Sequence, residues 1–326
     1  MKEGTIPVYG TGGYMLSVNE ALSYDKDAIG IGRKGTIDKP YILYAPFWTV
    51  DTLFYAIPAE KFDLNFAFDI FQNIDWKMKD ESTGVPSLSK TAINNIDIFI
   101  PKYYEQQFIG RLFSNLDNLI TLHQRKCDNL KKIKKAMLEK MFPKNGNSVP
   151  DVRFKGFTDD WEQRKVQNVA DRFDNLRIPV AANLRVHGTT PYYGANGIQD
   201  YVDGFTHDGE FVLVAEDGAN DLKNYPVKCV NGRIWVNNHA HVLQGKAGIA
   251  DNSFLAFAIS QSDIESLLVG GGRAKLNAET LMSIEFRLPC LQEQYQISEY
   301  LTLLDNLITL HQRKADTKKL LTGKIF

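Results

Sequence analysis

The sequence predicts an α+β fold: two mixed α/β domains alternate with two long helices in an internal repeat of pseudo-two-fold symmetry. Two observations support this fold class. The segment Asp117–Lys126 recurs without change as Asp305–Lys314, 188 positions further along the chain. Each copy lies in a run with apolar residues at helical spacing, and each run follows short apolar segments separated by glycine turns, as in β structure.

The repeat extends beyond this identical core. Pro101, Glu105 and Gln106 match Pro289, Glu293 and Gln294 at the same offset, and the glycine-rich segment 7–13 resembles 191–197. Between the matching positions the two halves have diverged. The sequence therefore indicates two variable domains attached to two nearly identical helices.

Length and composition agree with this division. A chain of 326 residues is long enough for about two domains with their own cores. No signal peptide begins at Met1, and no apolar run approaches the roughly 18 residues that span a bilayer. Cys127, Cys229 and Cys290 lack CxxC spacing, which favours a reducing, cytoplasmic location. The net charge of −1 leaves a nucleic-acid partner open, because phosphate contacts depend on local basic density.

Short strands are expected in both variable domains. In the first half they are expected at 28–32, 41–45 and 48–57, and in the second half at 210–216 and 233–243. Helices are expected at 251–260 and 262–268, the second opened by a capping box from Ser262 to Glu265.

The long helices carry heptad patterns. From Glu105 to Phe142 the chain has no proline and no glycine except Gly110, so one helix of 34 to 38 residues is expected. It would be about 50–57 Å long. The apolar residues alternate in steps of three and four, as in a coiled-coil seam. The predicted seam residues are Ile109, Leu112, Leu116, Leu119, His123, Leu130, Ile133, Met137, Ile297, Tyr300, Leu304, Leu307, His311 and Leu321.

Two such seams in one chain predict an antiparallel coiled coil. His123 and His311 lie near the middle of their helices, so antiparallel pairing brings them together as a polar layer that fixes the register. Alternatively, Lys126 and Lys314 extend out of the seam to solvent and set no register. The basic run 131–135 is either a solvated face or a binding surface.

With these features the chain resembles the DNA-specificity (S) subunits of type I restriction–modification enzymes. The resemblance rests on the ordered, duplicated motifs: Tyr-Gly-x-x-Gly at 9–13 and 193–197, Trp48 and Trp235 in similar surroundings, and the Pro-x-x-x-Glu-Gln helix entries. It implies target-recognition domains at 1–100 and 151–288, helices at 101–142 and 289–326, and a linker at 143–150. The opening of the second half, from Pro150 to Trp161, is also similar to starts of domains in this family.

The resemblance also implies a function. Such a subunit is non-catalytic, needs no cofactor or metal, and directs two methyltransferase subunits to a split sequence in double-stranded DNA. Restriction subunits join through the complex. Because residue 1 aligns near residue 185, the first recognition domain is expected to be truncated at its N-terminus. The alternatives are an inactive truncated variant and a coiled-coil scaffold that reads no DNA.

Basic residues and polar turn residues are the candidates for DNA contacts. Arg33 and Lys34 lie in a glycine-flanked loop, and Glu216 and Asp217 occupy the equivalent position of the second half. The Tyr-Gly-x-x-Gly segment is alternatively interpreted as a structural turn, which such segments more often form, and 270–275 as a connector that ends a helix. The full candidate set is Arg33, Lys34, Arg172, Arg177, Arg185, Tyr193, Asn196, Lys223, Arg233, Arg273 and Lys275.

Catalytic motifs are missing from the sequence. It contains no Asn/Asp-Pro-Pro-Tyr for adenine methylation and no G-x-x-x-x-G-K-[ST] for ATP-driven translocation. His239 and His241 alternate on a predicted strand without a third ligand nearby, so no metal site is predicted. A self-contained enzyme of a fused restriction system would need the methylase motifs. No active site is therefore predicted.

Overall fold

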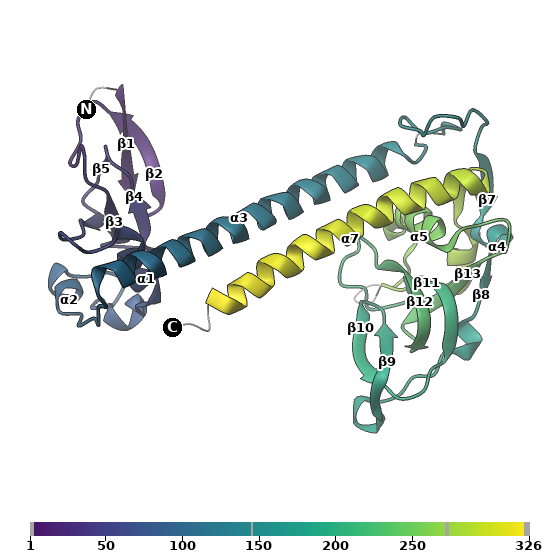
Figure 1. Cartoon of the computed structure of the whole chain (residues 1–326). Helices are drawn as coiled ribbons and strands as arrows, with labels where there is room; N and C mark the ends of the chain where they lie inside the picture. The colour runs from purple at the N-terminus through teal and green to yellow at the C-terminus, as the bar shows by residue number, and fades with distance from the viewer. Residues whose placement is uncertain (1–2, 145, 271–273, 323–326) are drawn as a thin grey trace. The chain divides into compact units, whose positions relative to one another are not determined.

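The computed structural model describes residues 3–144, 146–270 and 274–322. The chain forms two compact units, 1–125 with 311–326 and 126–310, so each unit contains one variable domain and parts of both long helices (Figure 1). We call residues 3–100 the first head and 151–288 the second head. No helix among the described residues is long and apolar enough to cross a membrane.

The first head contains two small sheets. Their strand orders are β2-β1-β5 and β4-β3-β6. The strands are β1 (Glu3–Gly10), β2 (Gly13–Val18), β3 (Ala28–Gly32), β4 (Tyr41–Leu43), β5 (Trp48–Thr49) and β6 (Leu53–Ala56). The helices that follow are α1 (Leu64–Asn73), the 3-10 turn η1 (Trp76–Lys79) and α2 (Lys90–Asn94).

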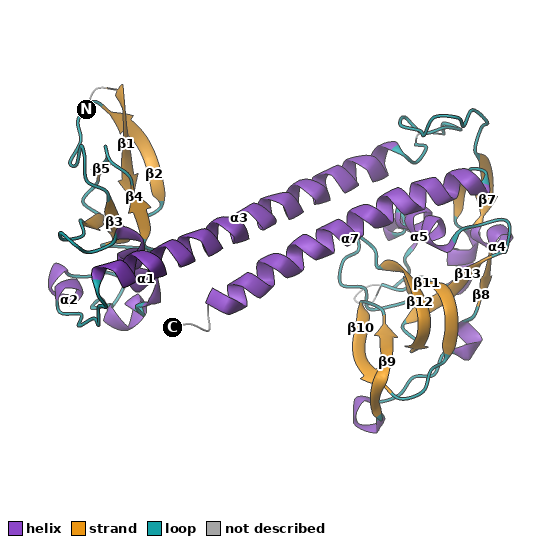
Figure 2. Ribbon diagram, viewed as in Figure 1, coloured by secondary structure: helices purple, strands orange, loops and turns teal. Residues whose placement is uncertain are grey.

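The second head is built around one six-stranded sheet in the order β10-β9-β12-β11-β13-β8 (Figure 2). Its strands are β8 (Ala170–Arg172), β9 (His187–Gly194), β10 (Gly197–Val202), β11 (His207–Ala215), β12 (Val227–Val236) and β13 (Ala240–Gly245). A separate ladder joins β7 (Glu162–Lys165) to β14 (Glu285–Leu288). The helical elements are α4 (Val166–Val169), η2 (Asp174–Leu176), η3 (Ala182–Leu184), α5 (Asn252–Ser260), η4 (Glu265–Leu267) and α6 (Ala278–Ser283).

The two heads share a strand topology. In each, a hairpin closes at the Tyr-Gly-x-x-Gly segment, with Gly10 opposite Gly13 and Gly194 opposite Gly197. Gly13 and Gly197 have φ of 103° and 109°, which explains the second glycine of the motif. The motif is thus a hairpin turn. In each head the tryptophan strand then runs parallel to the first hairpin strand, at Trp48 and at Trp235.

Several predicted elements differ from the structure. The segments 48–57 and 233–243, each predicted as one strand, are each two strands joined by a tight turn. The expected helix 262–268 is only the short 3-10 turn η4. Ser262 caps nothing there, because its hydroxyl donates to the Ala258 carbonyl at the end of α5. The capping-box prediction was therefore wrong.

The repeated Pro-x-x-x-Glu-Gln motif fastens each long helix to its head. The helices are α3 (Tyr103–Lys140) and α7 (Leu291–Thr322). In the first head Gln106 accepts from Asp63 N (3.1 Å) and donates to the Pro101 carbonyl. Gln294 makes the same two contacts, with Asp251 N (3.0 Å) and the Pro289 carbonyl. Asp63 and Asp251 are themselves the N-caps of α1 and α5.

Contacts between α3 and α7 occur in both units, and in the unit of 126–310 they run in antiparallel order. In the unit of 126–310, Cys127 contacts the Ile308 carbonyl, and the Lys134 ammonium binds the Asp305 carboxylate at 2.6 and 2.7 Å. In the other unit, His123 Nδ1 lies 2.9 Å from His311 Nδ1. The predicted meeting of the two histidines is confirmed. The supercoil itself stays a prediction.

The predicted heptad register on α3 was partly wrong. Leu112, Leu119 and Ile133 are 43%, 41% and 45% exposed, whereas Phe113, Ile120 and Cys127 are buried. The buried face is therefore displaced by one residue from the predicted d positions. The reason is that α3 also packs on its own head, where a Cβ at Gly110 would lie 2.6 Å from the Phe66 nitrogen.

The other seam residues fit better. Ile297 and Leu304 are buried, and the remaining predicted positions are half-buried, namely Ile109, Leu116, His123, Leu130, Met137, Tyr300, Leu307 and His311. The side chain of Leu321 lies outside the described residues.

Candidate nucleic-acid interface

In the first head, the candidate DNA-contacting side chains lie just after β3. Arg33 and Lys34 are both exposed and line an open cavity of about 710 Å³. The Arg33 guanidinium lies over the Phe54 ring, 5.6 Å from its centroid, and Nη1 donates to the Asp51 carbonyl at 3.4 Å. Among the described ion pairs, none involves either residue. Both positive charges are therefore available to an external phosphate.

The equivalent position of the second head carries the opposite charge. Arg33 N donates to the Thr52 carbonyl and Glu216 N to the His239 carbonyl, and the following backbone contacts also correspond. This confirms that Arg33 and Glu216 are structural counterparts. Glu216 accepts from Arg177 at 2.6 Å and forms an ion pair with Lys275 at 2.8 Å.

The carboxylate of Glu216 stays charged in this setting. Desolvation by burial would raise its pKa, but hydrogen bonds from Lys275 and Arg177 outweigh it, so the pKa lies below the ordinary value. The hydrogen bond to Glu216 correspondingly raises the pKa of Lys275. Glu216 is thus occupied by internal partners. The suggestion that it accepts from a cytosine is not supported by these contacts.

Asp174 and His241 extend this charged cluster into the core. His241 is 1% exposed; its Nδ1 lies 2.7 Å from Asp174 Oδ2 and its Nε2 lies 2.9 Å from the Leu276 carbonyl. Burial would raise the pKa of Asp174, but hydrogen bonds from His241 and Val242 N lower it below its ordinary value. The cluster ties four chain segments together. Sequence spacing could not reveal it, because its members come from distant segments.

His239 and His241 have different partners. His239 Nδ1 contacts Asp217, whereas His241 contacts Asp174 on another segment. No group of three or more His, Cys, Asp or Glu side chains that could hold a metal ion occurs among the described residues.

Three predicted DNA contacts of the second head turn out to be structural. Tyr193 is 6% exposed and lies in the core, which contradicts its prediction as a base reader. Arg177 is held by Glu216 and by the Ala240 carbonyl. Arg185 stacks 4.1 Å from the Tyr192 ring centroid and donates to the Val180 carbonyl and to Asp200. These three side chains are therefore mostly buried and held by contacts within the second head.

The other predicted residues lie at the surface. Asn196 bridges two turns, donating to the Gly218 carbonyl and accepting from Asn220 N. Arg233 is exposed beside Asp208 and lies over the Phe205 ring, and Arg172 is exposed 3.7 Å from Asp174. Lys223 is exposed in a turn. Lys275 is exposed but paired with Glu216, and Arg273 lies outside the described residues.

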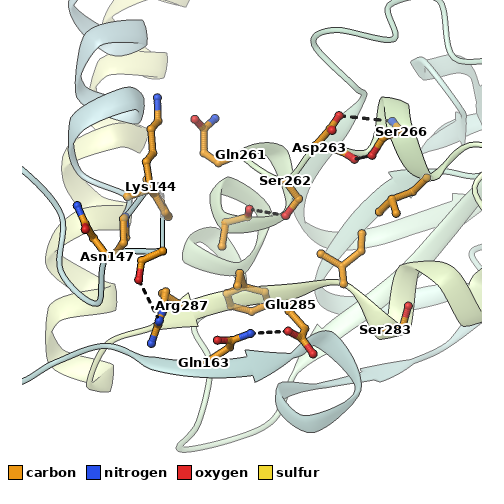
Figure 3. A pocket seen from close by; sticks show the side chains of 17 residues that line it. Lys144, Asn147, Gln163, Gln261, Ser262, Asp263, Ser266, Ser283, Glu285 and Arg287 are labelled. Atoms are coloured by element: carbon orange, nitrogen blue, oxygen red, sulfur yellow. Dashed lines mark hydrogen bonds between the residues drawn. The ribbon is translucent and has the colours of Figure 1, made fainter.

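A polar cavity of about 540 Å³ lies beside the β7–β14 ladder of the second head (Figure 3). Figure 3 shows Gln163 and Glu285 joined by a hydrogen bond on this ladder. Arg287 donates to the Gly146 carbonyl. These polar groups are engaged in holding the segment after α3 against β14.

Two topologically matched heads are attached to two repeated helices. Comparison with known proteins identifies the class. The chain matches the sequence model of the type I restriction modification DNA specificity domain over residues 1–132 and 158–317, and it belongs to this family.

Known relatives agree with this membership. A putative type I restriction enzyme specificity subunit of Haemophilus influenzae is 41% identical over 164 residues, which span 50% of this chain and 42% of the relative. A type I specificity subunit of Methanocaldococcus jannaschii is 24% identical over 76% of this chain and 67% of its own length. The match thus spans less than half of the length of the first relative.

The fold agrees as well. The crystal structure of the S subunit of a type I restriction-modification system from M. genitalium superimposes with a TM-score of 0.77. The match covers 99% of this chain and 87% of that one at 12% sequence identity. At this identity the likeness shows a shared fold, and side-chain roles must come from the chain itself.

Proposed function

We propose that the chain is a non-catalytic DNA-specificity subunit that reads a split target in double-stranded DNA, one part with each head. One observation supports this proposal most: the two heads share a strand topology but differ in surface chemistry. The first head presents Arg33 and Lys34 where the second presents a neutralised Glu216. Different donor and acceptor groups on the same scaffold would select different bases.

Each head has its own candidate residues for DNA contacts. In the first, Arg33 and Lys34 would contact phosphate or guanine edges. In the second, the exposed Lys223, Arg233 and Arg172 are the remaining basic candidates, with Asn196 at the hairpin turn. Affinity would come mainly from the phosphate contacts, so binding should weaken steeply with salt.

The test is to co-express the chain with its cognate methyltransferase and to map methylated adenines across the genome. We expect a gapped, two-part motif. Arg33→Ala with Lys34→Ala should relax or abolish only one part, and Lys79→Ala, another exposed lysine of the first head, should leave both unchanged. A stable complex that methylates nothing would instead identify an inactive variant, and methylation without sequence preference would favour the scaffold alternative.

We further propose that the helices bind two copies of the methyltransferase subunit, through which restriction subunits join. Inside the identical decapeptide, Asn118, Thr121, Leu122 and Arg125 are exposed, and so are their counterparts Asn306, Thr309, Leu310 and Arg313. Core packing does not explain identity at exposed positions. A surface repeated on both helices can bind two copies of one partner.

Leu122 and Leu310 provide a direct test of the stoichiometry, since they are 59% and 45% exposed apolar residues at equivalent positions. Leu122→Arg or Leu310→Arg alone should leave one methyltransferase subunit bound in native mass spectrometry, and the double variant none. Met78→Lys, at an exposed site in the first head, is the matched control. Two bound subunits in the double variant would contradict the proposed surface.

A further inference from the structure

The strands β11 and β12 of the second head carry an exposed arginine that its neighbours hold in place. Arg233 on β12 lies directly opposite Asp208 on β11, and its Nε donates to Asp208 Oδ2 at 3.2 Å. The guanidinium carbon lies over the Phe205 ring, 4.8 Å from its centroid. A carboxylate and an aromatic face therefore restrict the orientation of this guanidinium.

Strand geometry places the pair in solvent. Alternate side chains of β11 share one face of the sheet, and on the face of Asp208 the carboxylate of Glu210 contacts Asn252 of α5 at 3.2 Å. Val212, further along this face, is buried. Two residues before Glu210 the face is open to solvent, because the side chains of Asp208 and Arg233 are 51% and 65% exposed. An ion pair this exposed contributes little to stability, so the fold does not explain it.

The terminal nitrogens of Arg233 remain free to donate. Asp208 accepts only from Nε, and neither Nη1 nor Nη2 has a hydrogen-bond partner among the described residues. A guanidinium presents its hydrogens in a rigid planar fork, which matches two acceptors that lie side by side. Guanine presents such a pair, O6 and N7, in the major groove of DNA, and arginine is the side chain that commonly recognises it.

No other arginine in the described part of the second head combines these properties. Arg185 also stacks on an aromatic ring, but its side chain is only 14% exposed. Arg164 is exposed, but its Nε and Nη2 both bind Glu162. Arg172 is exposed 3.7 Å from Asp174, which is too far for a hydrogen bond to fix its direction.

We propose that Arg233 recognises the guanine of a G·C base pair in the part of the target that the second head binds. Nη1 and Nη2 donate to guanine O6 and N7, and Asp208 and Phe205 act as positioning residues. A guanidinium that is already oriented loses less freedom on binding. This inference rests on the proposed function, because it requires that the second head reads DNA. It names one defined base pair, which a phosphate contact would not select.

The first test compares the methylated motifs of variants of the full chain in complex with its cognate methyltransferase. In Arg233→Ala we expect one G·C position, in one part of the motif, to become degenerate while the other positions are retained. Arg233→Lys should give the same result, because an ammonium keeps the charge but cannot form the fork. Asp208→Asn should weaken the preference at the same position and at no other.

Arg164→Ala is the matched control, since Arg164 is an exposed arginine of the same head with a carboxylate neighbour. It should leave the motif unchanged. A uniform loss of methylation in Arg233→Ala, with every position of the motif retained, would overturn the proposal and identify Arg233 as a phosphate contact.

A modified base tests the contacted atom. In a duplex that carries 7-deazaguanine at the identified position, the N7 acceptor is missing but base pairing is kept. We expect the complex to bind this duplex about tenfold more weakly than the unmodified one, and the Arg233→Ala complex to bind both equally. Equal binding of the two duplexes by the unmodified complex would overturn the proposal.

Failure of this inference is distinguishable from failure of the proposed function. Methylation without sequence preference would contradict both. A gapped, two-part motif that Arg233→Ala leaves intact would contradict only the role of Arg233.

Discussion

The two heads have the same strand topology but are stabilised by different means. The second head closes its sheet with β8, buries Trp161 under α5 and neutralises Glu216 with Arg177 and Lys275. In the described part of the first head, β6 ends its sheet, and Arg33, which has no ion pair there, stands at the position of Glu216. A shared topology therefore constrains the backbone, while charge and edge protection can change independently. Four predictions test this contrast.

The largest effect is expected for Trp161→Ala. Trp161 is 1% exposed and packs against Phe142 and Phe254, so its loss should cost about 3–5 kcal/mol of stability. Hydrogen exchange should accelerate in the second head and stay unchanged in the first. Phe99→Ala is the control, since truncating that exposed side chain should change stability by less than about 0.5 kcal/mol. Equal destabilisation of both heads would show that they fold as one cooperative unit.

Next in size is Glu216→Gln, which removes the nearer carboxylate partner of Arg177 and leaves it only Asp174 at 3.6 Å. Because these side chains are only 14% and 15% exposed, we expect a loss of about 2–3 kcal/mol in denaturant unfolding. The matched change Arg33→Gln should alter stability by less than about 0.5 kcal/mol and instead weaken DNA binding. A stability loss as large in Arg33→Gln would remove the distinction drawn between the two positions.

A third prediction concerns a carboxylate of the first head. Burial, with a smaller contribution from Asp117, raises the pKa of Asp69 to about 7, and its Oδ2 has no hydrogen-bond partner among the described residues. In the second head, the position of Asp69 is occupied by Phe257, and that of Asp117 by Asp305, which binds Lys134. Asp69 thus prefers to be protonated when folded.

The raised pKa of Asp69 determines the direction in which stability changes with pH. The folded state holds the Asp69 proton above the ordinary pKa of 3.8, so the free energy of unfolding falls as pH rises from there to about 7 and then levels off. Asp69→Asn should remove this slope and stabilise the first head by about 1–2 kcal/mol above neutral pH, after allowance for solvent screening. Denaturation of both variants across this pH range measures it. An unchanged slope would contradict the assignment to Asp69.

The smallest effect is expected at the histidine pair. Replacing His123 and His311 by Leu removes a polar contact with ring centroids 5.2 Å apart, and should raise stability by about 1 kcal/mol. The register of the helices should become less well defined, which disulfide trapping between introduced cysteines would detect as mixed pairing. A single register in the double variant would show that contacts other than the histidine pair align the helices. That result would agree with the alternative in which Lys126 and Lys314 extend to solvent and no polar layer fixes the register.

Sequence patterns predicted the repeat, the long helices and the hairpin turns because these depend on local spacing and on glycine. The meeting of His123 with His311 was also predictable, since it follows from antiparallel symmetry alone. The register on α3 was not predictable, because α3 packs on its own head at Gly110 and contacts its partner helix at Cys127. Heptad spacing cannot distinguish these two kinds of burial.

The candidate DNA contacts were likewise predictable only in part. The correspondence between Arg33 and Glu216 could be inferred from the aligned turns, and the backbone contacts confirm it. The sequence could not show which candidates have internal partners, as Arg177, Arg185 and Tyr193 do. A basic or aromatic residue in a turn has the same sequence signature whether it faces solvent or a carboxylate. Sequence alone therefore determined the duplicated architecture and the family, through periodicity and local motifs. Only the tertiary structure decided which charges are neutralised and which sheet edge is open, because both depend on segments that are distant in the chain and adjacent in space.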